Sequence, residues 1–108
     1  MADKAEVKRL VKELSDLDGD EGDRSAAAEA LGELGDKSAE PGLIKALSDP
    51  DNFVRSEAAR SLGTLGDKSA VPALIKALSD PDNFVRRTAA TELGSLGDKS
   101  AASALMKA

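Results

Sequence analysis

The chain has 108 residues, a formal net charge of −5, and no cysteine, histidine, tryptophan or tyrosine. Thiol chemistry, disulfides, zinc sites built on cysteine or histidine, and acid–base catalysis by imidazole are therefore excluded within it. The amino-terminal residues lack the apolar core of a signal peptide, and no stretch approaches the ~20 apolar residues of a membrane helix. We therefore expect a cytoplasmic protein with no membrane partner, and its acidity argues against a nucleic-acid partner.

Two adjacent stretches of 31 residues are nearly the same: residues 36–66 and 67–97 match at 24 positions. The string GDKSA begins at Gly35, at Gly66 and again at Gly97. A period of this length is typical of stacked supersecondary units and not of one closed globule. We expect one domain over residues 1–108 with about 3.5 repeats: a degenerate first repeat (1–35), two regular repeats (36–66 and 67–97) and a half repeat (98–108).

Each regular repeat is predicted to hold two helices. In the third repeat, Val71, Leu74 and Leu78 follow the spacing of one apolar helix face. A glycine after each second helix, such as Gly66, suits a left-handed carboxyl-terminal position, and a proline such as Pro81 stops the first helix. The predicted helices cover residues 3–15, 23–34, 37–48, 52–65, 68–79, 83–96 and 99–107.

The turn of the first repeat is acidic and two residues longer than the turns of the regular repeats. Asp16, Asp18 and Asp20 alternate as in a calcium-binding EF-hand loop. The rest of that pattern is missing, because Glu21 replaces the required glycine and Ala27 replaces the bidentate glutamate. We expect a flexible acidic loop in a capping repeat and no metal or cofactor; a weak cation site is the alternative.

Three features of the repeat point to a known family: a proline early in the first helix, a turn aspartate, and a Val-Arg pair early in the second helix. In the third repeat these are Pro72, Asp80 and Val85-Arg86. From Ala5 to Lys107 the chain resembles HEAT-like repeats, in the short version found in phycobilisome-lyase-type proteins. The resemblance implies an all-α, right-handed α-solenoid of antiparallel helix pairs with seven helices. It also implies that Asp and Arg side chains form a hydrogen-bonded ladder between repeats, here at Asp49, Arg55, Asp80 and Arg86.

Seven positions differ between the two regular repeats, and five of them fall in the second helix. Their offsets of 0, 1, 4, 5 and 8 trace one stripe of a helix, which we expect to be exposed. The resemblance implies that the second helices line the concave surface, where partners dock, although free drift of exposed residues would leave the same pattern. The expected partner-binding residues are Ser25, Glu29, Glu33, Ser56, Glu57, Arg60, Thr64, Arg87, Thr88, Thr91 and Ser95.

The only aromatic residues, Phe53 and Phe84, stand at the start of the second helices. We expect them to pack between repeats. Exposed anchors for a ligand are the alternative.

At the carboxyl end, Leu105 and Met106 correspond to Leu74 and Ile75, but no second helix follows to cover them. Residues 98–108 are therefore either a cap or part of a longer array. The uncovered apolar stripe predicts weak self-association through this end.

These features predict a non-catalytic interaction or scaffold module that holds a protein or peptide on its concave face, and not an enzyme. The resemblance offers an alternative, a subunit or accessory factor of a bilin lyase-type enzyme. For that role no carboxylate pair stands in an evidently apolar segment that would raise its pKa. Binding to nucleic acid is disfavoured, because basic residues do not cluster along the sequence and stacking aromatics are absent.

Overall fold

The computed structural model describes residues 3–97, which form six α-helices and two short 3-10 helices. Six of the seven predicted helices are confirmed in an all-α fold, and the seventh, at residues 99–107, lies outside the described residues. The first helix of each repeat is α1 (Lys4–Ser15), α3 (Glu40–Ala46) or α5 (Val71–Ala77). The second helices are α2 (Glu21–Leu34), α4 (Asn52–Leu65) and α6 (Asn83–Leu96), and the 3-10 helices η1 (Lys37–Ala39) and η2 (Lys68–Ala70) precede α3 and α5.

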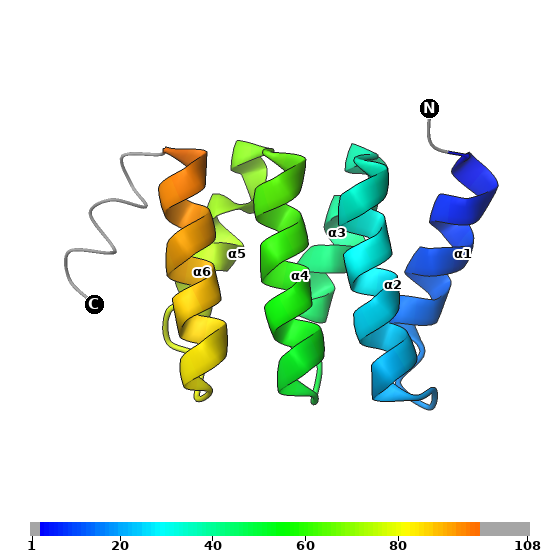
Figure 1. Ribbon diagram of the computed structural model, residues 1–108, viewed down its shortest axis with the longest axis horizontal. Coiled ribbons are helices and arrows are strands. Elements are labelled where there is room, and N and C mark those ends of the chain that lie inside the picture. Colours follow the sequence, from blue (N-terminus) through cyan, green and yellow to red (C-terminus); the bar gives the residue numbers. More distant parts are fainter. Residues whose placement is uncertain (1–2, 98–108) are drawn as a thin grey trace.

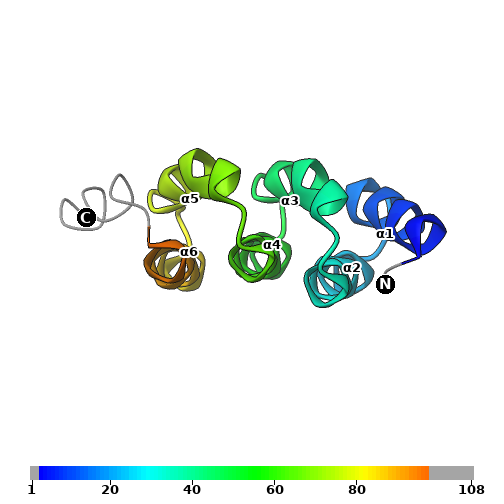
Figure 2. The ribbon, with the colours of Figure 1, turned by 90° about the horizontal axis from the view of Figure 1, so that it is seen from above.

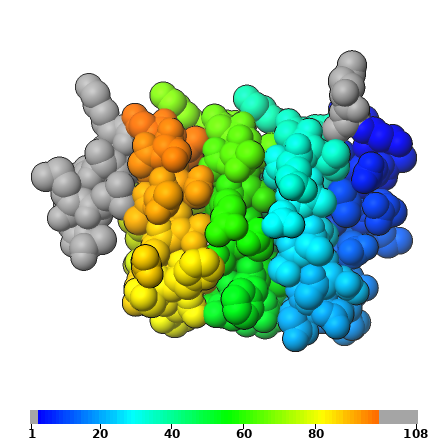
Figure 3. Space-filling view, in the orientation of Figure 1, coloured from blue at the N-terminus to red at the C-terminus, as the bar shows by residue number. Residues whose placement is uncertain are grey.

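Antiparallel helix pairs stack in a row and form an α-solenoid two layers deep (Figures 1 and 2). The first helices α1, α3 and α5 make one layer, and the second helices α2, α4 and α6 make the other. The second helices pack directly on one another and cover their face of the molecule as adjacent columns (Figure 3). Contact between α3 and α5 is sparse by comparison. The second-helix layer is therefore closed, and the first-helix layer is more open.

Proline explains why the first helices of the regular repeats are short. Pro41 and Pro72 stand in the first turn of α3 and α5, each of which is 7 residues long. A single helix over residues 37–48 is predicted, but the structure has the 3-10 helix η1 and then α3. Proline lacks the N–H that an earlier start of the helix would use, and its ring would clash with the preceding turn. In α1 the equivalent residue is Lys8, and that helix runs for 12 residues.

Glycine and aspartate set the helix ends. The expected left-handed positions after the second helices are confirmed, with φ of 70° at Gly35, 72° at Gly66 and 66° at Gly97. Only glycine adopts this conformation without a steric penalty. The second helix of the first repeat begins at Glu21, two residues earlier than predicted, because the carboxylate of Asp20 caps its first turn.

One hydrophobic core runs between the two layers through all described repeats. Alanines such as Ala28, Ala58 and Ala59 are fully buried in the second helices, where their small side chains allow close approach of the backbones. Larger side chains fill the space between the layers. The fully buried leucines come from all six helices: Leu14, Leu31, Leu43, Leu62, Leu74 and Leu93.

Candidate partner-binding surface

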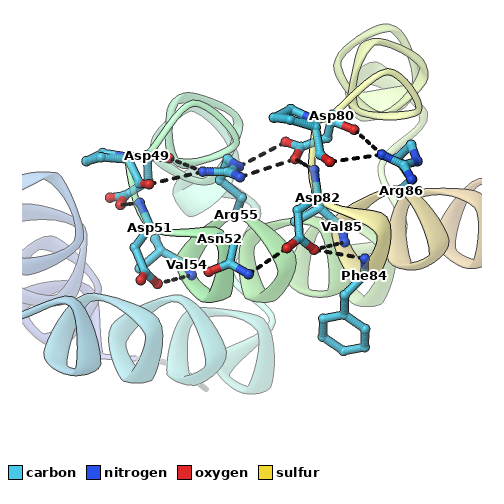
Figure 4. A network of polar contacts seen from close by, with 12 residues as sticks. Asp49, Asp51, Asn52, Val54, Arg55, Asp80, Asp82, Phe84, Val85 and Arg86 are labelled. Carbon is cyan, nitrogen blue, oxygen red and sulfur yellow. Dashed lines mark hydrogen bonds and ion pairs between the residues drawn. The ribbon is translucent and has the colours of Figure 1, made fainter.

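Bidentate ion pairs join successive repeats as a ladder, part of which is drawn in Figure 4. Arg24 donates from Nε to Asp49 Oδ2 at 2.9 Å and from Nη2 to Asp49 Oδ1 at 3.1 Å. Arg55 makes the same two bonds to Asp80, at 2.9 and 3.2 Å. The planar guanidinium favours this paired geometry. Each arginine thus reaches the turn aspartate of the repeat that follows it.

Arg24 is a ladder residue that the sequence prediction does not include. The longer turn of the first repeat hides its equivalence to the arginines of the regular repeats. The following residue could have revealed this equivalence, since Arg24 directly precedes Ser25 just as Arg55 directly precedes Ser56. The hydrogen bonds to Asp49 raise the pKa of the Arg24 guanidinium above its ordinary value.

Arg86 makes the contacts within its own repeat that Arg55 also makes, from Nη1 to two carbonyl oxygens of the preceding turn. Its Nη1 donates to the carbonyl oxygens of Asp80 at 2.7 Å and Pro81 at 3.1 Å. Within residues 3–97 no aspartate stands one repeat further along to receive its remaining donors. The described ladder therefore has two complete rungs and one arginine that makes only the local contacts.

A second cross-repeat bond runs beside the ladder. Asn52 Nδ2 donates to Asp82 Oδ2 at 2.7 Å, while the other Asp82 oxygen accepts from the N–H groups of Phe84 and Val85 (Figure 4). The bonds from Val85 and Asn52 lower the pKa of the Asp82 carboxyl. Asp82 therefore caps α6 and ties it to the preceding repeat with one side chain.

The predicted stripe on the second helices is exposed only in part. Its buried members are Ser56 and Thr88, whose hydroxyl oxygens lie 3.2 Å apart in a hydrogen bond between α4 and α6. The expectation that the whole stripe is exposed is wrong, because the second helices pack side by side and one edge of the stripe lies in their interface. Ser25 and Glu57 are half-buried. The exposed members are Glu29, Glu33, Arg60, Thr64, Arg87, Thr91 and Ser95.

A further divergent pair, Ser61 and Glu92, also lies between second helices. Ser61 is buried and donates from Oγ to the carbonyl oxygen of Ala28 at 2.7 Å. It sits against Gly32, where an added Cβ would collide with the serine. Glu92 lies against Gly63 in the same way one repeat later. Burial raises the pKa of the Glu92 carboxyl, an effect that the charge of Arg60 partly offsets.

The exposed residues of α4 and α6 surround a hollow of about 230 Å³. Its charged groups come from both helices: Arg60 forms an ion pair with Glu57 at 3.3 Å, and Arg87 forms no ion pair with any described residue. We call this hollow the α4–α6 hollow. It is lined by Arg60, Phe84, Arg87, Thr88, Thr91 and Glu92.

Both aromatic side chains face solvent. Phe53 is 63% exposed and Phe84 is 45% exposed, so the prediction that they pack between repeats is wrong. The residues that follow them, Val54 and Val85, are fully buried. Successive residues of a helix point about 100° apart, so the valines fill the core and the phenylalanines are turned outward. Phe84 thereby becomes one wall of the α4–α6 hollow.

The acidic turn of the first repeat uses its carboxylates as caps. Asp16 Oδ1 accepts from the N–H of Asp18 at 3.1 Å, and Asp20 Oδ1 accepts from Gly22 N–H at 2.5 Å. In the part of the chain that the structure describes, no three acidic side chains converge as metal ligands. None of the described helices is long and apolar enough to cross a membrane.

A family model described as HEAT repeats matches residues 7–74 and 54–108. Among solved structures, the chain is similar to one in the complex of CpcE and CpcF of phycocyanin lyase from Nostoc sp. PCC7120, with 38% sequence identity and a TM-score of 0.85. The match covers 94% of this chain and 41% of that chain, so this chain spans less than half the length of the structure it matches. No curated protein matches the sequence.

Proposed function

Since the chain belongs to the HEAT repeat family, we propose that it is a non-catalytic binding module that holds a protein or peptide on the face of its second helices. Repeat proteins of this kind present extended surfaces because each unit contacts only its neighbours. The observation that carries the proposal is the α4–α6 hollow, with two arginines on its rim and an exposed aromatic ring as one wall.

The chemistry of this hollow favours an acidic stretch of the partner. Arginine offers a planar fork of five donors on a long stem, and it is frequent among the residues that dominate binding energy. Arg87 has no ion-pair partner among the described residues, and its guanidinium is free to bind a carboxylate. Phe84 supplies apolar area beside it. A partner with a carboxylate next to an apolar side chain matches both groups.

Charge along the second-helix layer supports a fixed direction of binding. In α2 the exposed Glu29 and Glu33 place negative charge at that end, and in α4 and α6 the exposed Arg60 and Arg87 place positive charge at the other end. A partner with its acidic stretch over the arginines avoids repulsion by the glutamates only in one orientation. We also propose that the hollow is not a catalytic site. Glu92 is the single carboxyl among its lining residues, so no second acidic group is there to share acid–base work. The hollow is also too open to exclude water from a reaction.

A second candidate rests on the similarity to a chain of the CpcE–CpcF complex. In this alternative the chain is a subunit or accessory factor of a bilin lyase-type enzyme and contributes binding rather than chemistry. Calorimetric titration of the chain with phycocyanin, and with CpcE and CpcF, tests it directly. Saturable binding to any of the three supports the alternative, and no heat of binding to any of them removes it.

Charge reversal tests the binding face. A partner is first recovered on the immobilised chain from native lysate and identified by mass spectrometry. Arg87→Glu is expected to weaken its binding by about 2 kcal/mol or more, because arginine and carboxylate become two repelling carboxylates. Lys8→Glu, on the exposed side of α1, is the matched control. Melting temperatures equal to that of the parent show that both variants keep the fold. If Lys8→Glu weakened partner binding and Arg87→Glu did not, the binding site would lie elsewhere.

A further inference from the structure

The first-helix layer carries two hollows that repeat each other. One lies between α1 and α3 and has a volume of about 170 Å³; the other lies between α3 and α5 and has a volume of about 360 Å³. Each takes a Leu-Ser pair from the earlier repeat, Leu14-Ser15 or Leu47-Ser48. Each takes its other wall from the later repeat, at equivalent positions: Gly42, Lys45, Ala46, Ser48 and Asp49, or Ala73, Lys76, Ala77, Ser79 and Asp80.

Short first helices explain why these hollows exist. Because α3 and α5 are each 7 residues long, they make little contact with each other, whereas the second helices pack directly on one another in the opposite layer (Figure 2). The walls that remain are apolar, and Ile44 and Leu47 are only half-buried beside the larger hollow. At the edge of the smaller hollow, Leu17 is 60% exposed. Apolar surface is therefore left open along this side.

The two layers carry opposite charge. Residues 3–15, 36–48 and 67–79, which hold the first helices, contain eight basic and six acidic residues, a net charge of +2. The turns and second helices, at residues 16–34, 49–65 and 80–96, contain five basic and thirteen acidic residues, a net charge of −8. No lysine occurs in the second group of segments. The segments that hold the first helices are thus weakly basic in an acidic protein. The carboxylates of Asp49 and Asp80 also line the hollows, but they are paired with Arg24 and Arg55.

One lysine stands at each hollow. Lys45 and Lys76 occupy the same position in their repeats and are exposed, and neither forms an ion pair with any described residue. Each hollow therefore combines an apolar wall with an unneutralised ammonium group. An apolar side chain with a carboxylate close to it complements both features.

We propose that the first-helix layer binds an extended acidic peptide segment of a partner protein. Its apolar side chains enter the two hollows, and its carboxylates lie at Lys45 and Lys76. Neighbouring packed helices are about 8–10 Å apart. A segment in the extended polyproline II conformation rises about 3.1 Å per residue and has three residues per turn. Apolar residues three positions apart therefore lie on the same side of the segment and reach successive hollows, with an acidic residue between them.

The site is separate from the α4–α6 hollow, because the two lie on opposite layers (Figure 2). An experiment can therefore disprove binding on the second helices without disproving binding on the first-helix layer, and the reverse is also true. Arg87→Glu therefore distinguishes the two sites, because binding that depends on Arg87 belongs to the α4–α6 hollow.

Selection from a library of random peptides of about nine residues, displayed on phage and panned on the full chain, tests the proposal. Enriched peptides are expected to be acidic, with apolar residues at a spacing of three. Their affinity, measured by fluorescence anisotropy, is expected to fall at least about tenfold in Lys45→Glu/Lys76→Glu. It is expected to fall less than about twofold in Lys8→Glu, a charge reversal at an exposed lysine of α1 that lines neither hollow. Ala73→Leu, which fills the larger hollow without a change of charge, is expected to weaken the same peptides.

Three outcomes would overturn the proposal. The first is no enrichment over an unrelated solenoid. The second is enrichment of peptides whose binding depends on Arg87 and not on the lysines. The third is binding of the chain to vesicles of mixed neutral and anionic phospholipids that Lys45→Glu/Lys76→Glu abolishes while the peptides fail to compete, which would assign the basic layer to a membrane surface. Circular dichroism of each variant confirms that the helices are retained.

Discussion

Between α2 and α4, the buried Ser61 sits against Gly32 and bonds the Ala28 carbonyl, whereas between α4 and α6 the equivalent residue is Glu92, which lies against Gly63. The serine is small enough for the contact and finds a hydrogen-bond acceptor there. The glutamate is larger, and burial raises the pKa of its carboxyl. One substitution between two nearly identical repeats thus replaces a buried, hydrogen-bonded serine by a half-buried carboxyl that lines the α4–α6 hollow.

The ladder shows the same difference. At the first interface the side chains of Arg24 and Asp49 are 5% and 2% exposed, and at the second those of Arg55 and Asp80 are 14% and 8% exposed. The hydrogen-bond lengths are nearly the same at both rungs. Exposure and not geometry therefore distinguishes them, and the energy of an ion pair depends strongly on exposure.

The largest expected effect breaks the more buried rung. Asp49→Ala leaves the Arg24 guanidinium buried without its carboxylate and is expected to lower the free energy of unfolding by about 3–5 kcal/mol. Asp80→Ala, at the more exposed rung, is expected to lower it by about 1–3 kcal/mol. Urea unfolding followed by circular dichroism measures both.

The double variant Arg24→Met/Asp49→Ala is the control for the first rung, because it leaves no buried charge. It is expected to be more stable than Asp49→Ala alone. If Asp80→Ala were the more damaging of the two single changes, exposure would not explain the difference between the rungs.

A core change tests whether α4, the helix shared by both interfaces, holds the stack together. Leu62 is fully buried there, and Leu62→Ala is expected to lower the free energy of unfolding by about 2–5 kcal/mol. Thr64→Ala, exposed on the same helix, is expected to stay within about 0.5 kcal/mol of the parent. Equal losses for the two in urea melts would contradict the assigned buried face.

Glu92→Ser makes the α4–α6 interface resemble the α2–α4 interface. This change is expected to raise the free energy of unfolding, by less than the changes above lower it. Glu92→Ser removes a carboxyl from beside Gly63 and places a hydroxyl where Ser61 stands one repeat earlier. A hydrogen bond to the Ala59 carbonyl, the counterpart of Ala28, would stabilise the fold by about 0.5–1.5 kcal/mol. Thermal unfolding at neutral pH measures the gain. No gain would mean that the α4–α6 backbones do not approach as closely as α2 and α4 do.

The stability gained by Glu92→Ser is expected to depend on pH. The pKa of the Glu92 carboxyl is raised in the folded state, so this group favours folding at low pH and opposes it as pH rises above about 4.3. The advantage of Glu92→Ser over the parent is therefore expected to grow between pH 4 and pH 7. A gain that is constant over this range would show that packing and not ionisation produces it.

The smallest expected effect concerns acid stability at the second interface. The pKa of the Asp82 carboxyl is lowered by its bonds from Val85 and Asn52. Because the folded pKa lies below the unfolded value of about 3.9, the stabilisation is present above that pH and is lost as pH falls through the folded pKa. Asp82→Asn is expected to lose stability less steeply with acid than the parent does. Parallel stability curves for the two proteins below pH 5 would count against the linkage.

Local signals explain why most of the fold could be predicted. The 31-residue period, the glycines after second helices and the apolar spacing within each helix all act over a few residues, and the helix pairs follow from them. The exception at α3 and α5 is also local, since Pro41 and Pro72 turn the start of each predicted helix into a 3-10 segment. The candidate site was predicted less well. Seven of its residues are exposed, but Ser56 and Thr88 are not.

Periodicity along the chain therefore settled which segments are helices, where they end and how they pair, because hydrogen bonding, capping and apolar spacing act between near neighbours in sequence. Packing between helices settled the rest. Arg24 meets Asp49 across 25 residues, and Ser56 meets Thr88 across 32, so their burial depends on how the second helices align. Lysines spread along the sequence gather on one layer only after folding. Contacts over such separations leave no local pattern, and the hollows and charged faces that would recognise a partner arise from them.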